Sequence, residues 1–365
     1  MQLTLPTDAK RILLIRPSAL GDVARSVPLV AALRRARPNA RIEWMIQAEF
    51  TDIASAHPAV DEVIPFPRAS LGRDLRRLRL TPPTRWAQSL RDRAYDAVID
   101  AQGLLRSAAI AAITGAKFRA GFADARECAG LLYTRRVRST SVHTVDRMLD
   151  LIRAIGIDPC PAPPGLSQPA SQPAFLASST GTPDMRLYLP PGVSDPNPAS
   201  DTAAEASPIV IAPTSRWPAK AWPIERYAEL TSRLLAQHAS RVVIIGAPSE
   251  RAACGPLLEL AKTDPRVIDR VGKLAVSGAM REISAARLIV ANDSAAAHIA
   301  VGFDRPIVAL YGPTDVSKVG PYRRSRDVLQ HRTPQDTLKH KDARNAAMMA
   351  RITVDEVLAA CRERL

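Results

Sequence analysis

The chain has 365 residues, which is enough for two domains or for one large domain. It carries 50 basic and 36 acidic residues, a net charge of +14, and its 46% hydrophobic and 24% charged residues are typical of globular proteins and exclude a largely disordered chain. There is no run of 18 apolar residues, and the first residues lack the basic and apolar regions of an export signal. We therefore expect a cytoplasmic protein.

In the first 158 residues, short apolar runs alternate with helical patterns. The expected strands are 11–15, 41–46, 60–66 and 95–100, and the expected helices include 22–36, 104–113 and 143–155. This alternation indicates βαβ units, in which helices cover both faces of a parallel sheet.

Residues 159–208 contain 12 of the 31 prolines, which interrupt any continuous helix or strand. We interpret this segment as an interdomain linker. Within it, the alternation over Met185 to Leu189 predicts a short edge strand.

After the linker the alternation begins again. Strands are expected at 209–212, 241–245, 288–291 and 307–311, with helices between them, the first beginning near Ile224. The predicted fold is therefore α/β, with two Rossmann-like domains, 1–158 and 209–350, facing across a cleft. In such sheets ligands bind beyond the carboxyl ends of the strands, so the loops that follow the apolar runs are expected to carry the chemistry.

Residues 351–365 are predicted to form a C-terminal amphipathic helix. Thr353 caps it, Glu356 stands at the capping-box spacing, and the apolar positions are 354, 357, 358, 361 and 365. Because its polar face carries both signs of charge, we expect this helix to pack on the core and not on a membrane.

The first loop after a predicted strand reads RPSALGD and ends at Asp22. Its Gly21 permits a tight turn that brings Asp22 near the start of the next helix. The loop lacks the glycines of a dinucleotide-binding G-x-G-x-x-G, and a carboxylate at a helix N-terminus would repel a bound anion. Two interpretations of Asp22 stay open: a helix N-cap, or a general base that takes a proton from an acceptor hydroxyl.

The corresponding loop of the second half, 212–224, combines hydroxyls with cations: Thr214, Ser215, Arg216 and Lys220. An arginine and a lysine ahead of a helix can neutralise a diphosphate leaving group as its bond to a sugar breaks. The alternative is a solvated loop anchored by Trp217 and Trp222.

The strongest local pattern is NDSAAAH, which directly follows a predicted strand. Asp293 and Ser294 at the helix start expose backbone amides to an anion, and the GPTD sequence after the neighbouring strand lets a second backbone approach at Gly312 and Thr314. His298 lies one helical turn beyond Ser294, where it either faces the same place or packs as a structural histidine.

Several motifs are absent from the sequence. There is no HExxH, no P-loop, no G-x-S-x-G and no clear D-x-D pair, and the four cysteines stand far apart. These absences argue against hydrolase, ATPase and metal-dependent chemistry, so we expect no metal site and no required cofactor.

Taken together, these loops resemble the bacterial lipopolysaccharide heptosyltransferase family, glycosyltransferases with the two-Rossmann-domain type B fold. The matching sequences occur in order along both halves: IRPSALGDV at 15–23, DAQGLLRS at 100–107, GF at 121–122 with ARE at 125–127, KAWP at 220–223, NDS at 292–294 with His298, and YGPTD at 311–315. Many family members have glycine where Ala295 stands.

The resemblance implies an inverting glycosyltransferase that moves heptose from ADP-heptose to an inner-core lipopolysaccharide or related glycan acceptor. By that likeness, Asp22 is the catalytic base and Lys220 is the cation for the donor phosphate. The donor is expected to bind second-domain residues, which are Thr214, Ser215, Arg216, Asp293, Ser294, Ala295, His298, Gly312 and Thr314. The acceptor is expected at first-domain residues, which are Gly21, Gln102, Arg106, Arg126 and Arg147.

A glycolipid or oligosaccharide acceptor would bring this enzyme, expected to be a monomer without a nucleic-acid partner, to the inner face of the cytoplasmic membrane. Two other classes of function stay open. One is a nucleotide-sugar epimerase of the same fold, which would turn over donor without any acceptor. The other is a non-catalytic protein that binds anions through its basic first half, because residues 1–160 hold 25 basic and 16 acidic residues.

Overall fold

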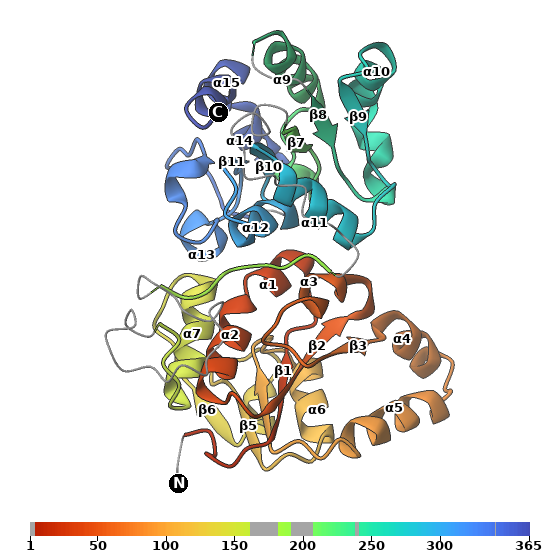
Figure 1. Ribbon diagram of the computed structural model, residues 1–365, viewed down its shortest axis with the longest axis vertical. Coiled ribbons are helices and arrows are strands. Elements are labelled where there is room, and N and C mark those ends of the chain that lie inside the picture. The colour runs from red at the N-terminus through yellow and green to blue at the C-terminus, as the bar shows by residue number, and fades with distance from the viewer. Residues whose placement is uncertain (1–3, 161–181, 191–206, 238–240, 340) are drawn as a thin grey trace. The chain divides into compact units, whose positions relative to one another are not determined.

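The computed structural model describes residues 4–160, 182–190, 207–237, 241–339 and 341–365 (Figure 1). The chain divides into two compact units, Met1–Tyr188 and Leu189–Leu365. Each unit contains a six-stranded parallel sheet with helices, which confirms the predicted α/β fold with two Rossmann-like domains. Most of the segment 159–208 lies outside the described residues.

The sheet of the first unit has the strand order β3-β2-β1-β4-β5-β6. Its strands are β1 (Arg11–Ile15), β2 (Arg41–Gln47), β3 (Glu62–Phe66), β4 (Ala97–Asp100), β5 (Phe118–Phe122) and β6 (Arg135–Val137). This is the order of a Rossmann sheet, in which the direction of strand addition reverses between β1 and β4. Ligands bind at that switch point, so the loops after β1 and β4 are the ones that matter for a site.

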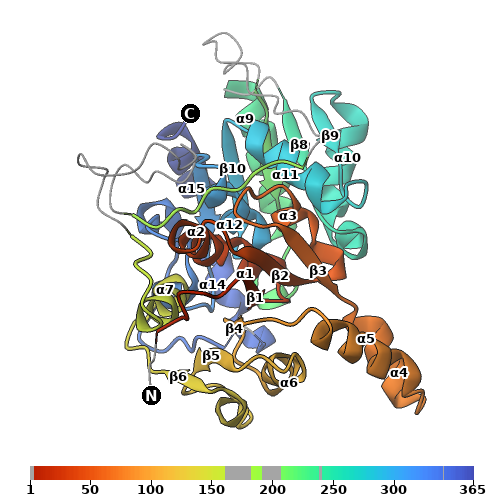
Figure 2. The same ribbon diagram turned by 60° about the horizontal axis from the view of Figure 1, so that its bottom comes forward.

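Two layers of helices flank this sheet (Figures 1 and 2). In one layer α2 (Val27–Ala36) contacts α7 (Thr144–Ala154), and in the other α5 (Thr81–Arg91) contacts α6 (Leu105–Ile113). The shorter helices are α1 (Leu20–Ala24), α3 (Asp52–Ser55), α4 (Arg68–Arg76) and the 3-10 turns η1 (Ala48–Phe50) and η2 (Ala129–Leu132). Covered on both faces, β1 is buried from Ile12 to Ile15, as its continuous apolar run predicted.

The helix predicted over 22–36 is wrong in one respect, because two helices form there instead of one. α1 ends at Ala24 and α2 begins at Val27, with Pro28 in its first turn. Proline has no N–H with which to continue the helical ladder of α1, whereas it is well tolerated in the first turn of a new helix. Asp22 therefore lies on a short helix immediately after β1.

The second sheet repeats the topology of the first, in the order β12-β11-β10-β7-β8-β9. Its strands are β7 (Ile209–Ala212), β8 (Val242–Ile244), β9 (Val267–Asp269), β10 (Leu288–Asn292), β11 (Ile307–Leu310) and β12 (Val328–Leu329). The direction of strand addition reverses between β7 and β10, so the loops after these two strands form the second switch point.

The helices of the second unit begin with α9, at the residue predicted. They are α9 (Ile224–Gln237), α10 (Gly255–Thr263), α11 (Val276–Ala285), α12 (Ala295–Gly302), α13 (Val316–Val319), α14 (Ala347–Ala350) and α15 (Val354–Arg362), with 3-10 turns η4 (Pro218–Lys220), η5 (Pro248–Cys254), η6 (Ser325–Asp327) and η7 (Ala343–Ala346).

The C-terminal helix α15 packs on the core of the second unit, as predicted. Thr353 and Glu356 form the expected capping box, and the buried face consists of Val354, Val357, Leu358, Ala360 and Cys361. Leu365 does not belong to this face, because it follows the helix end and is exposed. None of the helices in the described part of the chain has the length and apolar composition needed to cross a bilayer.

The short edge strand predicted from Met185 to Leu189 does not form. This segment has no regular secondary structure and contacts the first unit through side chains. Leu187 is buried, and the Tyr188 ring meets the His57 ring edge-on with centroids 5.1 Å apart. Asp184 accepts both the backbone amide and the guanidinium of Arg186, a local arrangement that takes the place of strand pairing.

Four strands were not expected from the sequence: β5, β6, β9 and β12. They are two to five residues long; β5 (FRAGF) contains an arginine and a glycine, and β6 (RRV) contains two arginines. Such short runs give no period-2 signal, and they become strands because each pairs in parallel with a strand already in the sheet.

Candidate active site

In the first unit, the loop after β1 places Asp22 in the first turn of α1. The Ala19 amide donates to Oδ2 of Asp22 at 3.0 Å, and the Arg25 guanidinium donates to Oδ1. Nη2 of Arg16 lies 3.3 Å from the same Oδ1. Asp22 is thus one residue of a compact cluster of charges at the switch point of the sheet.

The interpretation of Asp22 as the helix N-cap is wrong in position. The N-cap residue is Ala19, and Asp22 stands three residues later, where its carboxylate reaches back to the Ala19 amide. The contact with the helix start is compatible with a role of Asp22 as general base, because only Oδ2 accepts the Ala19 amide.

The two arginines keep Asp22 ionised. Burial favours the neutral acid, but the charges of Arg16 and Arg25, with the Ala19 amide, outweigh it and hold the pKa of Asp22 well below its usual range. The Asp22 side chain is 26% exposed, whereas those of Arg16 and Arg25 are 9% and 8% exposed. The carboxylate is therefore both charged and accessible, as a proton acceptor must be.

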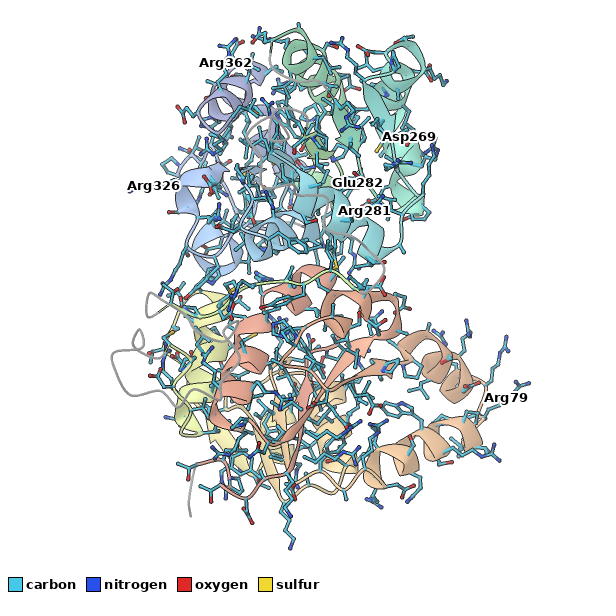
Figure 3. The ribbon with its side chains drawn as sticks, in the orientation of Figure 1. Arg79, Asp269, Arg281, Glu282, Arg326 and Arg362 are labelled. Atoms are coloured by element: carbon cyan, nitrogen blue, oxygen red, sulfur yellow. The ribbon has the colours of Figure 1, made fainter. Side chains whose placement is uncertain are left out.

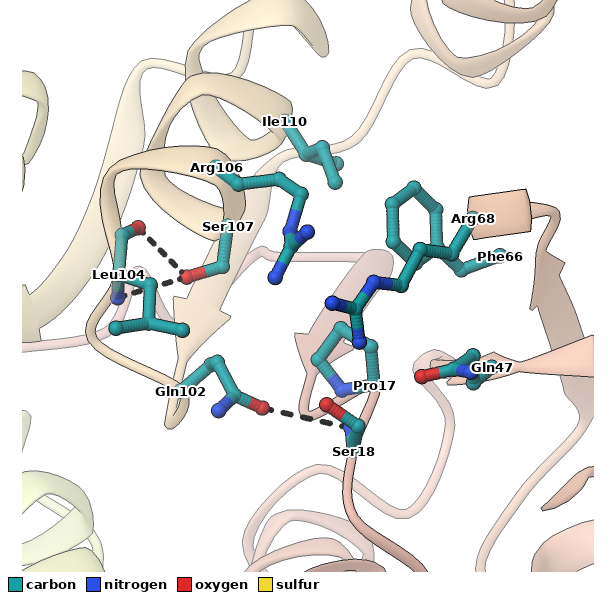
Figure 4. Close-up of a pocket in the computed structure, with 10 residues that line it drawn as sticks. All are labelled: Pro17, Ser18, Gln47, Phe66, Arg68, Gln102, Leu104, Arg106, Ser107 and Ile110. Atoms are coloured by element: carbon teal, nitrogen blue, oxygen red, sulfur yellow. Dashed lines mark hydrogen bonds between the residues drawn. The ribbon is translucent and has the colours of Figure 1, made fainter. Parts of the chain in front are cut away.

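A pocket opens beside this loop, at the carboxyl ends of β1 to β4 (Figure 4). Arg106 of α6 and Arg68 of α4 both extend toward it, and partial burial together with the charge of Arg68 lowers the pKa of Arg106. Oε1 of Gln102 accepts the Ser18 amide at 3.4 Å, so Gln102 links the loops after β4 and β1. The other lining residues are Pro17, Gln47, Phe66, Leu104, Ser107 and Ile110.

Two cations that approach each other favour an anion in the same pocket, and the charge of Glu127, which also acts on Arg106, is smaller in effect than that of Arg68. Arg106 and Gln102, predicted for the acceptor, line it, and the structure adds Arg68, Gln47 and Ser18. Arg68 was missed because it lies 38 positions before Arg106 in the chain, so only the parallel sheet brings the two together.

The remaining residues predicted for the acceptor lie outside this pocket. Arg147 pairs with Asp124 at 2.8 Å and stacks over the Phe122 ring at 5.3 Å. Arg126 is exposed, and its backbone amide donates to Gly103. Gly21 is buried within α1. The pocket therefore unites two of the five predicted acceptor residues.

Asp100, the last residue of β4, supports the Gln102 loop from below. Its Oδ1 accepts the amides of Gln102 at 2.8 Å and Gly103 at 3.3 Å, and its Oδ2 accepts the Tyr133 hydroxyl at 2.6 Å. Burial raises the pKa of Asp100, against these hydrogen bonds, which favour its charged form. Gly121 leaves room for the Tyr133 ring, since a Cβ at Gly121 would lie 2.4 Å from it.

In the second unit, the loop after β7 meets the loop after β10. Nζ of Lys220 donates to Oδ2 of Asp293 at 2.6 Å, and the two side chains are 13% and 7% exposed. Oγ of Ser215 donates to the Asp293 carbonyl at 3.3 Å. Lys220, Asp293 and Ser215, all predicted for the donor, therefore lie together.

Asn292 holds these two loops in place. Its Nδ2 donates to the Pro213 carbonyl at 2.6 Å, and its Oδ1 accepts the Trp222 amide at 3.2 Å and the Tyr227 hydroxyl at 3.0 Å. The Trp222 indole N–H donates to the Ile352 carbonyl at 2.9 Å, so Trp222 is a buried anchor. The loop 212–224 is thus fixed at both ends by hydrogen bonds and anchored by Trp222, as the alternative interpretation expected, while Arg216 within it is exposed.

Two further hydroxyls lie at the ends of the adjacent strands β10 and β11. Oγ of Ser294 and Oγ1 of Thr314 are buried and have no hydrogen-bond partner among the described residues. Ser294 is the N-cap of α12, but its hydroxyl makes no capping bond. Nε2 of Gln330, which the sequence did not single out, donates to the carbonyls of Gly312 and Thr314 and so orients their backbone.

Buried hydroxyls of this kind suit a polar ligand at the start of α12, where backbone amides also favour an anion. Ala295 is the first residue of this helix, in a conformation that alanine adopts readily. His298 is buried in α12, which favours the structural interpretation. Thr214 is half-buried and Arg216 is exposed in the loop after β7.

No three His, Cys, Asp or Glu side chains gather closely enough to hold a metal ion within the part of the chain that the structure describes.

Residues 84–348 match glycosyltransferase family 9 (heptosyltransferase). The chain belongs to this family. It is therefore a glycosyltransferase with the type B fold, and the epimerase and the non-catalytic anion-binding protein are set aside.

Curated relatives extend the similarity over nearly the whole glycosyltransferase. It is 30% identical to Pseudomonas aeruginosa lipopolysaccharide heptosyltransferase 1 over 328 residues, 87% of this chain and 82% of that protein. It is 28% identical to Escherichia coli lipopolysaccharide heptosyltransferase 1 over 339 residues, 90% of this chain and 95% of that protein.

Solved structures show the same fold. Escherichia coli ADP-heptose lipopolysaccharide heptosyltransferase II matches 97% of this glycosyltransferase with 98% of its own chain, at a TM-score of 0.70 and 24% identity. Escherichia coli heptosyltransferase WaaC, solved with ADP, matches 97% of this chain with 100% of its own, at a TM-score of 0.68 and 25% identity.

Proposed function

We propose that this glycosyltransferase transfers heptose from ADP-heptose to a lipopolysaccharide inner-core acceptor, with inversion at the anomeric carbon. The observation that carries the proposal is the Asp22 carboxylate, which is held ionised between two guanidiniums yet keeps 26% of its side chain exposed. The relatives named as lipopolysaccharide heptosyltransferases support the choice of sugar and acceptor.

In the proposed reaction Asp22 accepts the proton of the acceptor hydroxyl as that oxygen bonds to the anomeric carbon. The bond from this carbon to the ADP phosphate oxygen breaks in the same step, and ADP leaves with the electron pair. A single displacement on one carbon inverts its configuration. The low pKa of Asp22 keeps it deprotonated before each turnover, while Arg16 and Arg25 hold the carboxylate in a fixed orientation.

The donor side of the proposal is built on the second switch point. Lys220 supplies a positive charge toward the diphosphate, where negative charge develops as ADP leaves. The Ser294 and Thr314 hydroxyls and the amides at the start of α12 are available to donate to phosphate or sugar oxygens. Asp293 balances the charge of Lys220 at 2.6 Å and fixes the position of the ammonium.

The acceptor side uses the pocket in the first unit. Arg106 and Arg68 are proposed to bind an acidic group of the acceptor, and Gln102 to bind one of its hydroxyls. Arg126 and Arg147 remain candidates for more distant parts of the same acceptor. Because that acceptor is membrane-borne, we also propose a peripheral contact with the inner face of the cytoplasmic membrane.

The decisive experiment incubates the enzyme with ADP-heptose and a de-acylated inner-core acceptor and follows ADP release and the anomeric configuration of the product by NMR. We expect stoichiometric ADP and glycan product, with the configuration at the anomeric carbon opposite to that of the donor. Donor alone is the control. Equal consumption of donor without acceptor, or retention of configuration, would contradict the proposal.

Donor identity is tested separately by thermal denaturation in the presence of ADP, UDP and GDP. A ligand that binds only the folded state raises the melting temperature, so ADP should give the largest increase. A larger increase with UDP or GDP would contradict ADP-heptose as donor while leaving the transferase chemistry in place.

A further inference from the structure

The helices α4 and α5 form a hairpin, residues 68–91, that projects from the side of the first unit (Figures 1 and 2). Its base is anchored in the core: Leu71 and Trp86 pack against the core cluster, and Leu90 is buried in it. The Trp86 and Phe66 rings lie 5.7 Å apart. The hairpin is therefore held firmly at one end and free at the other.

The free end of the hairpin exposes two large apolar side chains. Leu78 is 85% exposed and Leu80 is 60% exposed, and both stand between the end of α4 and the start of α5. Leu78 is the most exposed large hydrophobic side chain in the described part of the chain. Two leucines at a projecting tip that no described residue covers indicate a surface that is covered in the working state.

The backbone conformation of Leu78 indicates that leucine at this position does not stabilise the folded chain. Leu78 has φ = 55°, in the left-handed region. Glycine or asparagine adopts this conformation at lower free-energy cost than leucine, which lacks any compensating packing here. A leucine that costs backbone energy and gains no burial in the protein is best explained by a contact outside it.

The rest of the hairpin is strongly basic. Residues 68–91 contain seven arginines and one acidic residue, Asp74, a net charge of +6 out of +14 for the whole chain. Arg68 extends toward the pocket, and Figure 3 shows Arg79 projecting from the hairpin end. The other six arginines are exposed, and no ion pair is formed by any of them within the described residues: Arg73, Arg76, Arg77, Arg79, Arg85 and Arg91.

We propose that the tip of the α4–α5 hairpin docks the protein on an anionic lipid bilayer. Leu78 and Leu80 enter the headgroup and acyl boundary, and Arg76, Arg77 and Arg79 contact the anionic headgroups around them. This inference rests on the proposed function, since a membrane-borne acceptor would be reached from such a surface. The proposed function includes a peripheral membrane contact, and this inference names the tip of the α4–α5 hairpin as the part of the protein that makes it.

The composition of the tip favours lipid over other anionic partners. Leucine side chains gain free energy from hydrocarbon but not from a phosphodiester backbone, and the one tryptophan of the hairpin, Trp86, is engaged with Phe66, so it is not available for base stacking. If two copies of this chain met through their hairpins, each hairpin would carry a net charge of +6, and the two would repel each other.

The test is co-sedimentation of the full chain with large vesicles of phosphatidylcholine containing 30% phosphatidylglycerol, and with pure phosphatidylcholine. We expect binding to the anionic vesicles that weakens with salt. Leu78→Asn with Leu80→Asn should lower the partition coefficient at least tenfold. Arg76→Gln with Arg77→Gln and Arg79→Gln should lower it by about fivefold per arginine, on the order of a hundredfold.

Two control proteins make the result specific. Leu78→Phe with Leu80→Phe keeps the apolar area and should bind as the unaltered protein does. Arg326→Gln with Arg332→Gln and Lys339→Gln removes the same charge from exposed cations of the second unit and should leave binding nearly unchanged. Figure 3 labels Arg326.

Transfer to a de-acylated acceptor in solution separates this inference from the proposed function. All hairpin variants should retain that activity, which also shows that they are folded. Equal binding by the asparagine variant and the unaltered protein would overturn the docking role of the tip. So would binding that falls equally in the Arg326, Arg332 and Lys339 variant, or lipid-independent dimerisation that the leucine substitutions abolish.

Discussion

The Lys220 ammonium lies 2.6 Å from Oδ2 of Asp293, and this ion pair joins the loops that follow β7 and β10. Both side chains are largely buried, so neither charge is solvated well enough to stand alone. Because the two strands border the switch point of the sheet, the pair fixes the geometry of the proposed donor site. Lys220 is thus both a structural residue and a source of charge for the donor.

Lys220→Met removes one partner and leaves the buried Asp293 carboxylate uncompensated. We expect the free energy of unfolding to fall by about 3–5 kcal/mol, with weaker binding of ADP. Urea denaturation and calorimetry measure the two effects. Lys318→Met is the matched control, because its pair with Asp315 is more exposed, at 63% and 28%, and should be worth about 0–1 kcal/mol.

Asp22→Asn keeps the size of the side chain and removes its ability to accept a proton. We expect kcat to fall by about 10²–10⁴-fold, with ADP affinity unchanged. Steady-state kinetics and calorimetry separate the two quantities. Asp304→Asn, at a carboxylate that is 90% exposed in the second unit, should leave both as they are. Near-normal turnover of Asp22→Asn would remove this residue from the mechanism.

Gly121→Ala places a Cβ 2.4 Å from the Tyr133 ring, which must then move away from Asp100. We expect a loss of about 1–3 kcal/mol in the free energy of unfolding, from overpacking in the core. Transfer activity should also fall, since Asp100 holds the Gln102 loop. Gly72→Ala is the control: no atom lies within 4 Å of its Cβ, and alanine within α4 should stabilise by about 0.5–1 kcal/mol.

His57 makes the stability of the first unit dependent on pH. The pKa of its imidazole is lowered to about 4, mainly because the ring is buried; the nearby Asp184 charge opposes this shift and the Arg186 charge adds to it. Nδ1 accepts the Ala59 amide at 3.1 Å, which a proton on that atom would prevent. In the unfolded chain the imidazole titrates near its ordinary value of about 6.5, so the unfolded state binds the extra proton first as the pH falls.

The free energy of unfolding should therefore decrease as the pH falls from about 6.5 to about 4, by about 3 kcal/mol from this one group, and should not decrease further from it below pH 4. Urea denaturation at intervals between pH 7 and 5 measures the slope, above the range in which most carboxylates titrate. His57→Gln should give a flatter profile over the same range. An unchanged slope would mean that His57 is not kept neutral by the fold.

Much of the fold follows from local patterns in the sequence. The continuous apolar runs of β1, β7 and β10 are typical of strands buried on both faces. The helical periodicity predicts the bounds of α6 and α7 and the start of α9 to within about one residue, and those of α15 to within about three. The loops that carry the candidate site were predicted from the same alternation, because parallel strands place their following loops at one edge of the sheet. These features depend on neighbours along the chain.

The pairing of distant residues depended on the tertiary structure. Asp22 and Arg25 are close in sequence, but Lys220 meets Asp293 across 73 positions, and Arg68 reaches the pocket of Arg106 from another helix. The short strands β5 and β6 likewise form on edges that the sheet already offers, because β5 pairs with β4 and β6 then pairs with β5. Sequence periodicity specifies which face of an element is buried, whereas the order of strands in the sheet decides which charges come together, and that order is a property of the whole domain.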